Sequence, residues 1–164
     1  MKKLLLMIMM LAPMAAFAQK FAHLNSQDLI TSLPEAIRVQ GELEAQGKIY
    51  ENELKAMQDE LQRKADDYDK NKNTMNATKQ AETEQQLQEL YGKIQQAAQD
   101  NQQAFNKMQQ EKLGPILEKV RKAIEEVAKA GNYVYVMELE GGQPLYINTA
   151  LSEDITAKVK AQLK

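Results

Sequence analysis

The sequence predicts an α+β protein that is mostly α, in which a long antiparallel coiled-coil hairpin is attached to a small β-sheet body. Apolar residues recur at steps of three and four over two segments of similar length, with a polar break near residues 71–79 between them. Strand-like segments occur only before the first of these helical segments and after the second. Because a hairpin brings its two ends together, we expect the strands at both ends to join in one sheet.

The first 18 residues are typical of an export signal. The stretch MKKLLLMIMMLAPMAAFA has two lysines, an apolar run, and a closing AFA of the kind that signal peptidase recognises. The apolar run is too short to span a membrane. We therefore expect cleavage between Ala18 and Gln19 and export of the mature chain. An uncleaved anchor is the alternative.

Composition narrows the function. Of 21 basic residues, the two signal lysines are removed, which leaves 19 against 23 acidic residues and a net charge of about −4. A nucleic-acid binder needs a concentrated basic face, so we expect no nucleic-acid partner. The chain has no cysteine, a single histidine (His23), and no phosphate-binding loop of the Walker type. An enzyme is the least supported class, and we expect no cofactor and no metal.

The mature chain is expected to begin with a strand. The segment KFAHLNSQDLI places alternate side chains on opposite faces and then changes to a helical turn. Ser32, Pro34 and Glu35 follow in the order of a capping box, in which a serine caps the helix and a glutamate three residues later reaches back. We expect the first long helix to begin there, with Ser32 as its N-cap.

Residues 35–112 are expected to form the coiled-coil arm. The first half has a 3.5-residue register of Leu43, Tyr50, Leu54, Met57, Leu61, Tyr68 and Met75. The second half has a register of Leu87, Tyr91, Ile94, Ala98, Phe105 and Met108. Between them, KNKNTMNATKQ is rich in Asn and Thr, whose side chains compete for backbone hydrogen bonds. This break favours a hairpin; one uninterrupted helix that dimerises with another chain is the alternative.

Residues 19–34 and 113–164 are expected to form the body. Pro115 should kink or restart the helix, because proline removes a backbone donor and clashes with the preceding turn. After it, ILEKVRKAIEEVAKA has a broad apolar stripe that suits packing against a sheet. Gly131 is expected to end this helix.

Two strands and a closing helix are expected after that glycine. The strands run from Tyr133 to Ile147 and should pair as a hairpin around the glycines at 141–142. SEDITAKVKAQLK should form a short helix capped by Ser152. Strands that are apolar on both faces suggest burial against other subunits. The candidate oligomerisation residues are Phe21, Leu24, Tyr133, Val134, Tyr135, Val136, Tyr146 and Ile147.

These features together resemble the Skp/OmpH family of periplasmic chaperones. The resemblance includes the signal, KFAHLNSQDLI, the LPEA helix start, the charged hairpin, GPILEKVRKAIEEVAKAGNYVYVME and the closing SEDITAKVKAQL, and so covers essentially the whole chain. It implies a homotrimer with a shared β body, from which three hairpins enclose a cavity. It also implies a periplasmic, ATP-independent holdase that binds unfolded outer-membrane β-barrel proteins before membrane insertion. A structural coiled-coil adaptor of the cell envelope is the alternative.

The tip of the hairpin is the candidate contact region. Three lysines lie in a stretch without acidic residues, and a methionine with a flexible side chain lies between them. The candidate residues for contact with client or membrane are Lys70, Lys72, Met75 and Lys79. A solvated turn is the alternative. The chain is acidic, whereas the best-studied family members are strongly basic, so we expect only weak contact with anionic lipid.

Overall fold

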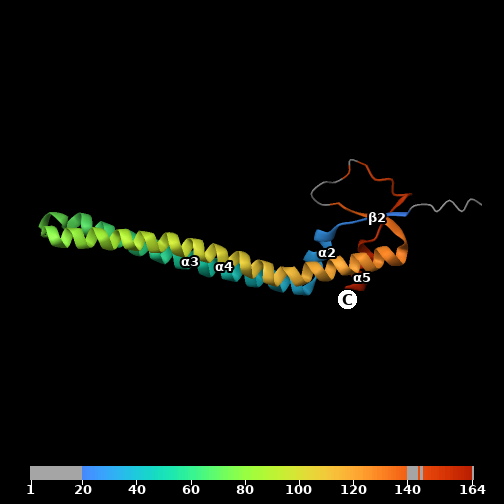
Figure 1. Cartoon of the computed structure of the whole chain (residues 1–164), viewed down its shortest axis with the longest axis horizontal. Helices are drawn as coiled ribbons and strands as arrows, with labels where there is room; N and C mark the ends of the chain where they lie inside the picture. The colour runs from blue at the N-terminus through green and yellow to red at the C-terminus, as the bar shows by residue number, and fades with distance from the viewer. Residues whose placement is uncertain (1–19, 140–143, 145, 164) are drawn as a thin grey trace, which may run out of the picture. The chain divides into compact units, whose positions relative to one another are not determined.

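A computed structural model describes residues 20–139, 144 and 146–163 (Figure 1). The elements follow in the order β1 (Lys20–Leu24), α2 (Ser26–Ser32), α3 (Pro34–Asn71), the 3₁₀ turn η1 (Lys72–Thr74), α4 (Ala77–Gly131), β2 (Tyr133–Glu138), β3 (Ser152–Asp154) and α5 (Thr156–Gln162). The chain divides into two compact units. We call Thr31–Glu118 the arm unit; the described residues up to Ile30 and from Lys119 onward form the body unit.

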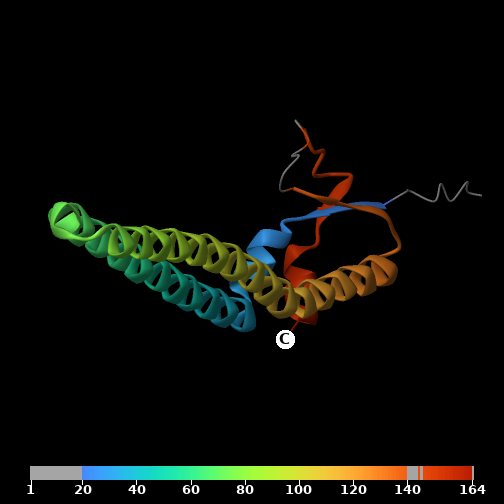
Figure 2. The ribbon, with the colours of Figure 1, turned by 60° about the vertical axis from the view of Figure 1, so that its left-hand side comes forward.

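The arm unit is the helical hairpin that the heptad pattern predicted. Figure 2 shows α3 and α4 side by side along its length. The 38 residues of α3 correspond to about 57 Å at about 1.5 Å per residue. Of the predicted seam, Leu43 and Ile94 are buried, whereas Ala98 is exposed and Tyr91 is 56% exposed. The seam is only partly covered, because each helix of a two-helix arm covers one side of its partner.

The chain reverses at the predicted break. After η1, the Met75 N–H donates to the Lys72 carbonyl at 3.3 Å. Asn76 then caps α4, because its side-chain oxygen accepts a hydrogen bond from the Lys79 N–H at 2.8 Å. The Asn-rich stretch is therefore a turn and a helix cap, which are positions that asparagine favours.

Two expected helix boundaries are wrong. Ser32 is the last residue of α2, and the N-cap position of α3 is Leu33, which makes no side-chain capping bond. Leu33 is buried, and Pro34 takes the first helical position, where its missing N–H is not needed. Pro115 does not restart the helix, since α4 continues through it. A kink at this position stays a prediction. The residue after it, Ile116, is only 5% exposed, and packing of this kind offsets the lost hydrogen bond.

The body unit contains a three-stranded parallel sheet in the order β2-β1-β3. Its register pairs Ala22 with Val136 on one side of β1 and with Glu153 on the other. The two ends of the hairpin sequence therefore join in one sheet, as predicted. β1 forms the centre, so both partner strands depend on it.

Among the described residues, no strand returns from β2 to pair with it as the expected β-hairpin requires. Tyr146 and Ile147 lie outside any strand, and the expected turn at 141–142 falls outside the described residues. The third strand is Ser152–Asp154, and it runs parallel to β1. The buried His23 ring, whose Nδ1 lies 2.9 Å from the Ser152 hydroxyl oxygen, links β1 to this strand. A polar tripeptide thus becomes a strand through a long-range contact that local sequence does not encode.

The last helix begins later than predicted. Ser152 is not its cap, because α5 begins at Thr156. An Asp154 carboxylate oxygen accepts a hydrogen bond from the Thr156 N–H at 2.9 Å, and hydrogen bonds from Thr156 lower the pKa of the Asp154 carboxyl. The predicted apolar stripe of α5 is confirmed, since its residues belong to the buried core. That core of the body unit consists of Ala22, Leu24, Leu29, Val120, Ala123, Ile155, Val159 and Leu163.

The end of α4 is formed by Gly131 together with Asn132, whereas the sequence predicted Gly131 alone. Gly131 is the last helical residue, and Asn132 after it has the left-handed backbone conformation with φ of 53°. A β-carbon on Gly131 would lie 2.1 Å from Cε2 of the Tyr133 ring. The glycine is therefore needed for the close approach of this ring.

Candidate functional site

Polar contacts join α3 to α4 near the base, in the middle and near the tip of the arm unit. Near its base, the Lys112 ammonium donates to the Glu42 carboxylate. Farther along, the Asn101 amide donates to Glu53 at 3.3 Å. Their partners are 70 and 48 residues apart in sequence, so neither contact could be recognised before the helix register was known.

The third contact lies near the tip, where the Tyr68 hydroxyl donates to Glu84. This hydrogen bond raises the pKa of the Tyr68 phenol. At the base, the hydrogen bond from Lys112 lowers the pKa of the Glu42 carboxyl, and Arg38 acts in the same direction. Polar side-chain pairs thus join α3 to α4 near both ends of the arm unit.

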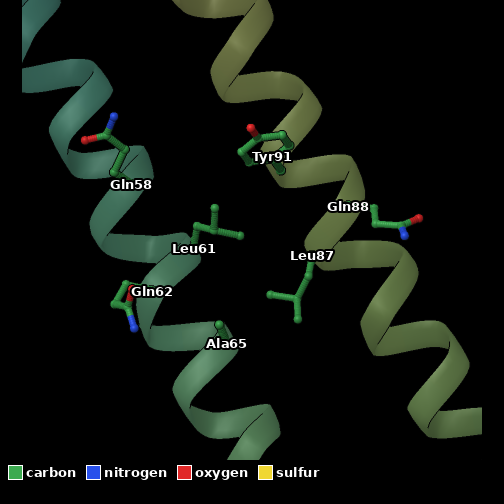
Figure 3. Close-up of a pocket in the computed structure, with 7 residues that line it drawn as sticks. All are labelled: Gln58, Leu61, Gln62, Ala65, Leu87, Gln88 and Tyr91. Atoms are coloured by element: carbon green, nitrogen blue, oxygen red, sulfur yellow. The ribbon is translucent and has the colours of Figure 1, made fainter.

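A groove of about 560 Å³ lies between α3 and α4 in the part of the arm between Glu53 and Tyr68. Its lining residues are Gln58, Leu61, Gln62, Ala65, Leu87, Gln88 and Tyr91. Figure 3 shows Leu61, Leu87 and Tyr91 directed toward the space between the two helices. The seam pattern predicted these three as packed residues, yet the helices leave an open hollow here.

The spacing of the seam residues did not predict this groove. Ala65 follows Leu61 by one turn on the same helix, and its small side chain leaves room where a larger residue would have filled the seam. Gln58 and Gln88 carried no signal, because Gln is abundant on all exposed faces of the arm. The small residue next to the seam was the only available hint.

The tip residues lie together, but their charges are partly compensated. Lys72 lies 3.0 Å from Asp69 and Lys79 lies 3.4 Å from Glu82. Acidic residues that flank the acid-free stretch therefore form ion pairs with two of its lysines. Lys70 is exposed. Met75 is half-buried and helps to line a smaller hollow of about 190 Å³. The contact role of these residues remains a prediction.

The candidate oligomerisation residues separate into different environments. On β2, Val134 and Tyr135 are 48% and 65% exposed, and Met137, which was not predicted, is exposed beside them. The Tyr135 ring stacks on Phe21 with centroids 6.2 Å apart. Among the described strands β2 pairs only with β1, so one of its edges is left without a strand partner.

The remaining members of that set are not part of this exposed strand face. Leu24 is 1% exposed and belongs to the core, and Val136 is half-buried. Tyr133 is half-buried, and its hydroxyl donates to Glu153 on β3. Tyr146 and Ile147 lie outside the sheet, and Tyr146 is 77% exposed.

Other candidate chemistry is limited within the described residues. The predicted cleavage site, Ala18 and Gln19, falls outside the described residues. None of the described helices is both long and apolar enough to span a membrane. The same part of the chain holds no cluster of three or more His, Cys, Asp or Glu residues placed to bind a metal ion.

Comparison with known proteins decides the family. Residues 20–163 match the model of the outer membrane protein (OmpH-like) family. The chain belongs to the OmpH-like family. A crystal structure of an OmpH-like protein from Caulobacter crescentus CB15, named as a candidate outer membrane chaperone, has a TM-score of 0.71 and 21% sequence identity to this chain. The alignment covers 88% of this OmpH-like chain and 83% of the Caulobacter chain. No curated protein matches the chain.

Proposed function

We propose that this OmpH-like protein is a periplasmic, ATP-independent holdase that binds unfolded outer-membrane β-barrel proteins and prevents their aggregation before insertion. The observation that supports it most is the arm unit, in which two long helices pack along a seam that is only partly covered. Unfolded barrel strands expose alternating apolar side chains and unpaired backbone, which aggregate by edge pairing. A half-exposed seam of this length offers such a chain many weak contacts rather than one deep pocket.

Family membership and the export signal support the cellular setting. The OmpH-like family is described as outer membrane proteins, and the similar Caulobacter protein is named as a candidate chaperone. The signal predicted for residues 1–18 would deliver the mature chain to the periplasm. We place the holdase there, where no nucleotide-driven step is needed because binding alone prevents aggregation.

The proposed assembly is a homotrimer formed through the body unit. The free edge of β2 and the exposed side chains of Val134, Tyr135 and Met137 support an interface there. Three copies would surround one client with three arms. The arms would then contribute contacts that one hairpin alone cannot supply.

The test dilutes a urea-unfolded β-barrel protein into buffer and follows light scattering. The holdase should suppress scattering at about one trimer per client, whereas an adaptor that only bridges envelope components would not. Deleting residues 44–50 and 103–109 shortens both helices by one matched heptad, about 10 Å, and leaves the three polar contacts in place. This variant should still trimerise but capture less client. Loss of trimers would contradict the separation of capture in the arm from assembly in the body.

A further inference from the structure

The groove between α3 and α4 differs from the rest of the arm seam in size. Its volume of about 560 Å³ exceeds the 230 Å³ and 190 Å³ of the hollows lined by Tyr50 and by Tyr68. Pockets that bind small molecules usually range from about 300 to 1,000 Å³. The groove is therefore large enough to take a large side chain together with part of its backbone.

The groove has an apolar floor. Leu61 and Leu87 are half-buried, the Tyr91 ring is 56% exposed, and all three point into the space (Figure 3). All seven lining residues are uncharged. An aromatic occupant would bury this exposed ring and gain an edge-to-face or offset-stacked contact with it. A charged occupant would be desolvated without a partner, so the lining favours a neutral, apolar side chain.

The rim of the groove carries amides. In Figure 3 the amides of Gln58, Gln62 and Gln88 point away from the space between the helices. The Gln62 amide donates to Asp66 at 2.7 Å, whereas Gln58 and Gln88 make no hydrogen bond within the described part of the chain. Each free amide can donate to and accept from a peptide backbone. The rim can thus satisfy backbone groups that an unfolded segment leaves unpaired.

The length of the groove favours an extended segment over a helix. From Gln58 to Ala65 the floor measures about 10 Å, which is the length of about three residues of an extended chain. A partner helix would need an apolar stripe that continues along the arm. Polar contacts between α3 and α4 flank the groove on either side, at Glu53 with Asn101 and at Tyr68 with Glu84.

We infer that this groove binds one aromatic or large aliphatic side chain of an extended, unfolded polypeptide segment. Leu61, Leu87 and Tyr91 contact the inserted side chain, while Gln58 and Gln88 turn inward to hydrogen-bond the backbone on both sides of it. The inference rests on the proposed holdase function and gives that function a defined subsite on each arm. It makes aromatic content, rather than charge, the feature of a segment that the arm selects.

A photo-cross-linking peptide tests the location in the unmodified protein. The probe is a neutral peptide of about nine threonine and serine residues with a central benzophenone-bearing phenylalanine. The inference predicts cross-links to residues 58–65 and 87–91, and competition by the same peptide with plain phenylalanine but not with alanine. Cross-links confined to other parts of the chain, or equal competition by the alanine peptide, would overturn it.

Matched variants test the groove in solution. Ala65→Phe fills the groove with a ring, whereas Ala104→Phe places the same ring at an exposed position of α4 outside the groove. The phenylalanine peptide should bind at least about tenfold more weakly to A65F, equivalent to about 1.4 kcal/mol, and within about twofold of wild type to A104F. Tyr91→Ala, at a position that is 56% exposed, should weaken binding to a similar extent. Equal binding by all three variants would overturn the inference.

The same variants separate the inference from the proposed function when a urea-unfolded β-barrel protein is the probe. If wild type suppresses aggregation and A65F does so equally well, the subsite is refuted while the holdase function stands. If wild type fails to suppress aggregation yet binds the phenylalanine peptide in a manner that A65F abolishes, the holdase function is refuted while the subsite stands. If both hold, suppression of aggregation should need several-fold more protein with A65F than with wild type or A104F.

Discussion

The close approach of the Tyr133 ring to Gly131 predicts that the effect of Gly131→Ala on the free energy of unfolding changes sign when the ring is removed. A β-carbon at position 131 would lie 2.1, 2.6 and 2.8 Å from three atoms of the Tyr133 ring. That ring is held in place, because its hydroxyl donates to Glu153 and accepts from Lys158 at 3.2 Å. Gly131→Ala therefore forces the ring out of its position and disrupts the link from β2 to β3 and α5.

The magnitude follows from two opposing effects. Gly131 is helical, so alanine there would by itself stabilise the helix by about 1 kcal/mol. Forcing apart groups in van der Waals overlap costs about 1–3 kcal/mol. In the wild-type background Gly131→Ala should thus lower the free energy of unfolding by about 1 kcal/mol. In a Tyr133→Ala background, where no ring is present, the same change should raise it by about 1 kcal/mol.

Urea unfolding of the four proteins, followed by circular dichroism at one protomer concentration, measures this cycle. The expected coupling free energy between the two positions is about 2 kcal/mol, within the range found for residues in contact. If Gly131→Ala has the same sign and size in both backgrounds, the ring does not occupy the space next to Gly131, and the described end of α4 is wrong.

Further predictions concern the arm unit. Lys112 and Arg38 lower the pKa of Glu42, so this carboxylate contributes stability above its unfolded-state pKa, and that stability is lost as the pH falls through its folded-state pKa. The difference in thermal midpoint between wild type and Glu42→Gln should therefore shrink on acidification below about pH 4. A difference that stays constant with pH would contradict the ion pair. Pro115→Ala should raise the free energy of unfolding in urea by up to about 3 kcal/mol, since α4 already continues through this position. A decrease would show that the proline is needed. Tyr68→Phe removes only the hydroxyl that binds Glu84, so hydrogen exchange should become faster in the last turns near η1 and stay unchanged in the sheet; uniform acceleration would argue against a local role.

Much of the fold could be predicted because its signals are local. The 3.5-residue register and the Asn-rich break gave the hairpin, since each depends on the preferences of neighbouring residues. The apolar strand segments before and after the hairpin predicted that the two would join in one sheet. The stripe of Ile155, Val159 and Leu163 gave the buried face of the last helix.

The errors arise where distant contacts decide the outcome. The segment Ser152–Asp154 lacks the sequence pattern of a strand. It nevertheless forms a strand beside β1, where Ser152 is hydrogen-bonded to His23. Ser32 has the sequence of a cap, yet the burial of Leu33 and the preference of Pro34 for the first helical position move the start of α3. Local preference was overridden by packing in both cases.

The groove could not be predicted from the seam residues alone. Leu61, Leu87 and Tyr91 have the same spacing as the packed residues of the seam, and only the separation of the helices distinguishes a hollow from a contact. Ala65 hinted at the extra space, but alanine is common on both helices. The candidate site therefore emerges from the structure, whereas the helices that build it emerge from the sequence.

The central claim is that several arms hold one unfolded outer-membrane protein, and solution mass tests it most directly. Light scattering coupled to size exclusion should be measured on the mature protein with and without a β-barrel protein diluted from urea. We expect the protein alone to have the mass of a trimer, and the mixture to contain a soluble species that is heavier by one client. A protein whose mass does not change while the client precipitates would contradict it.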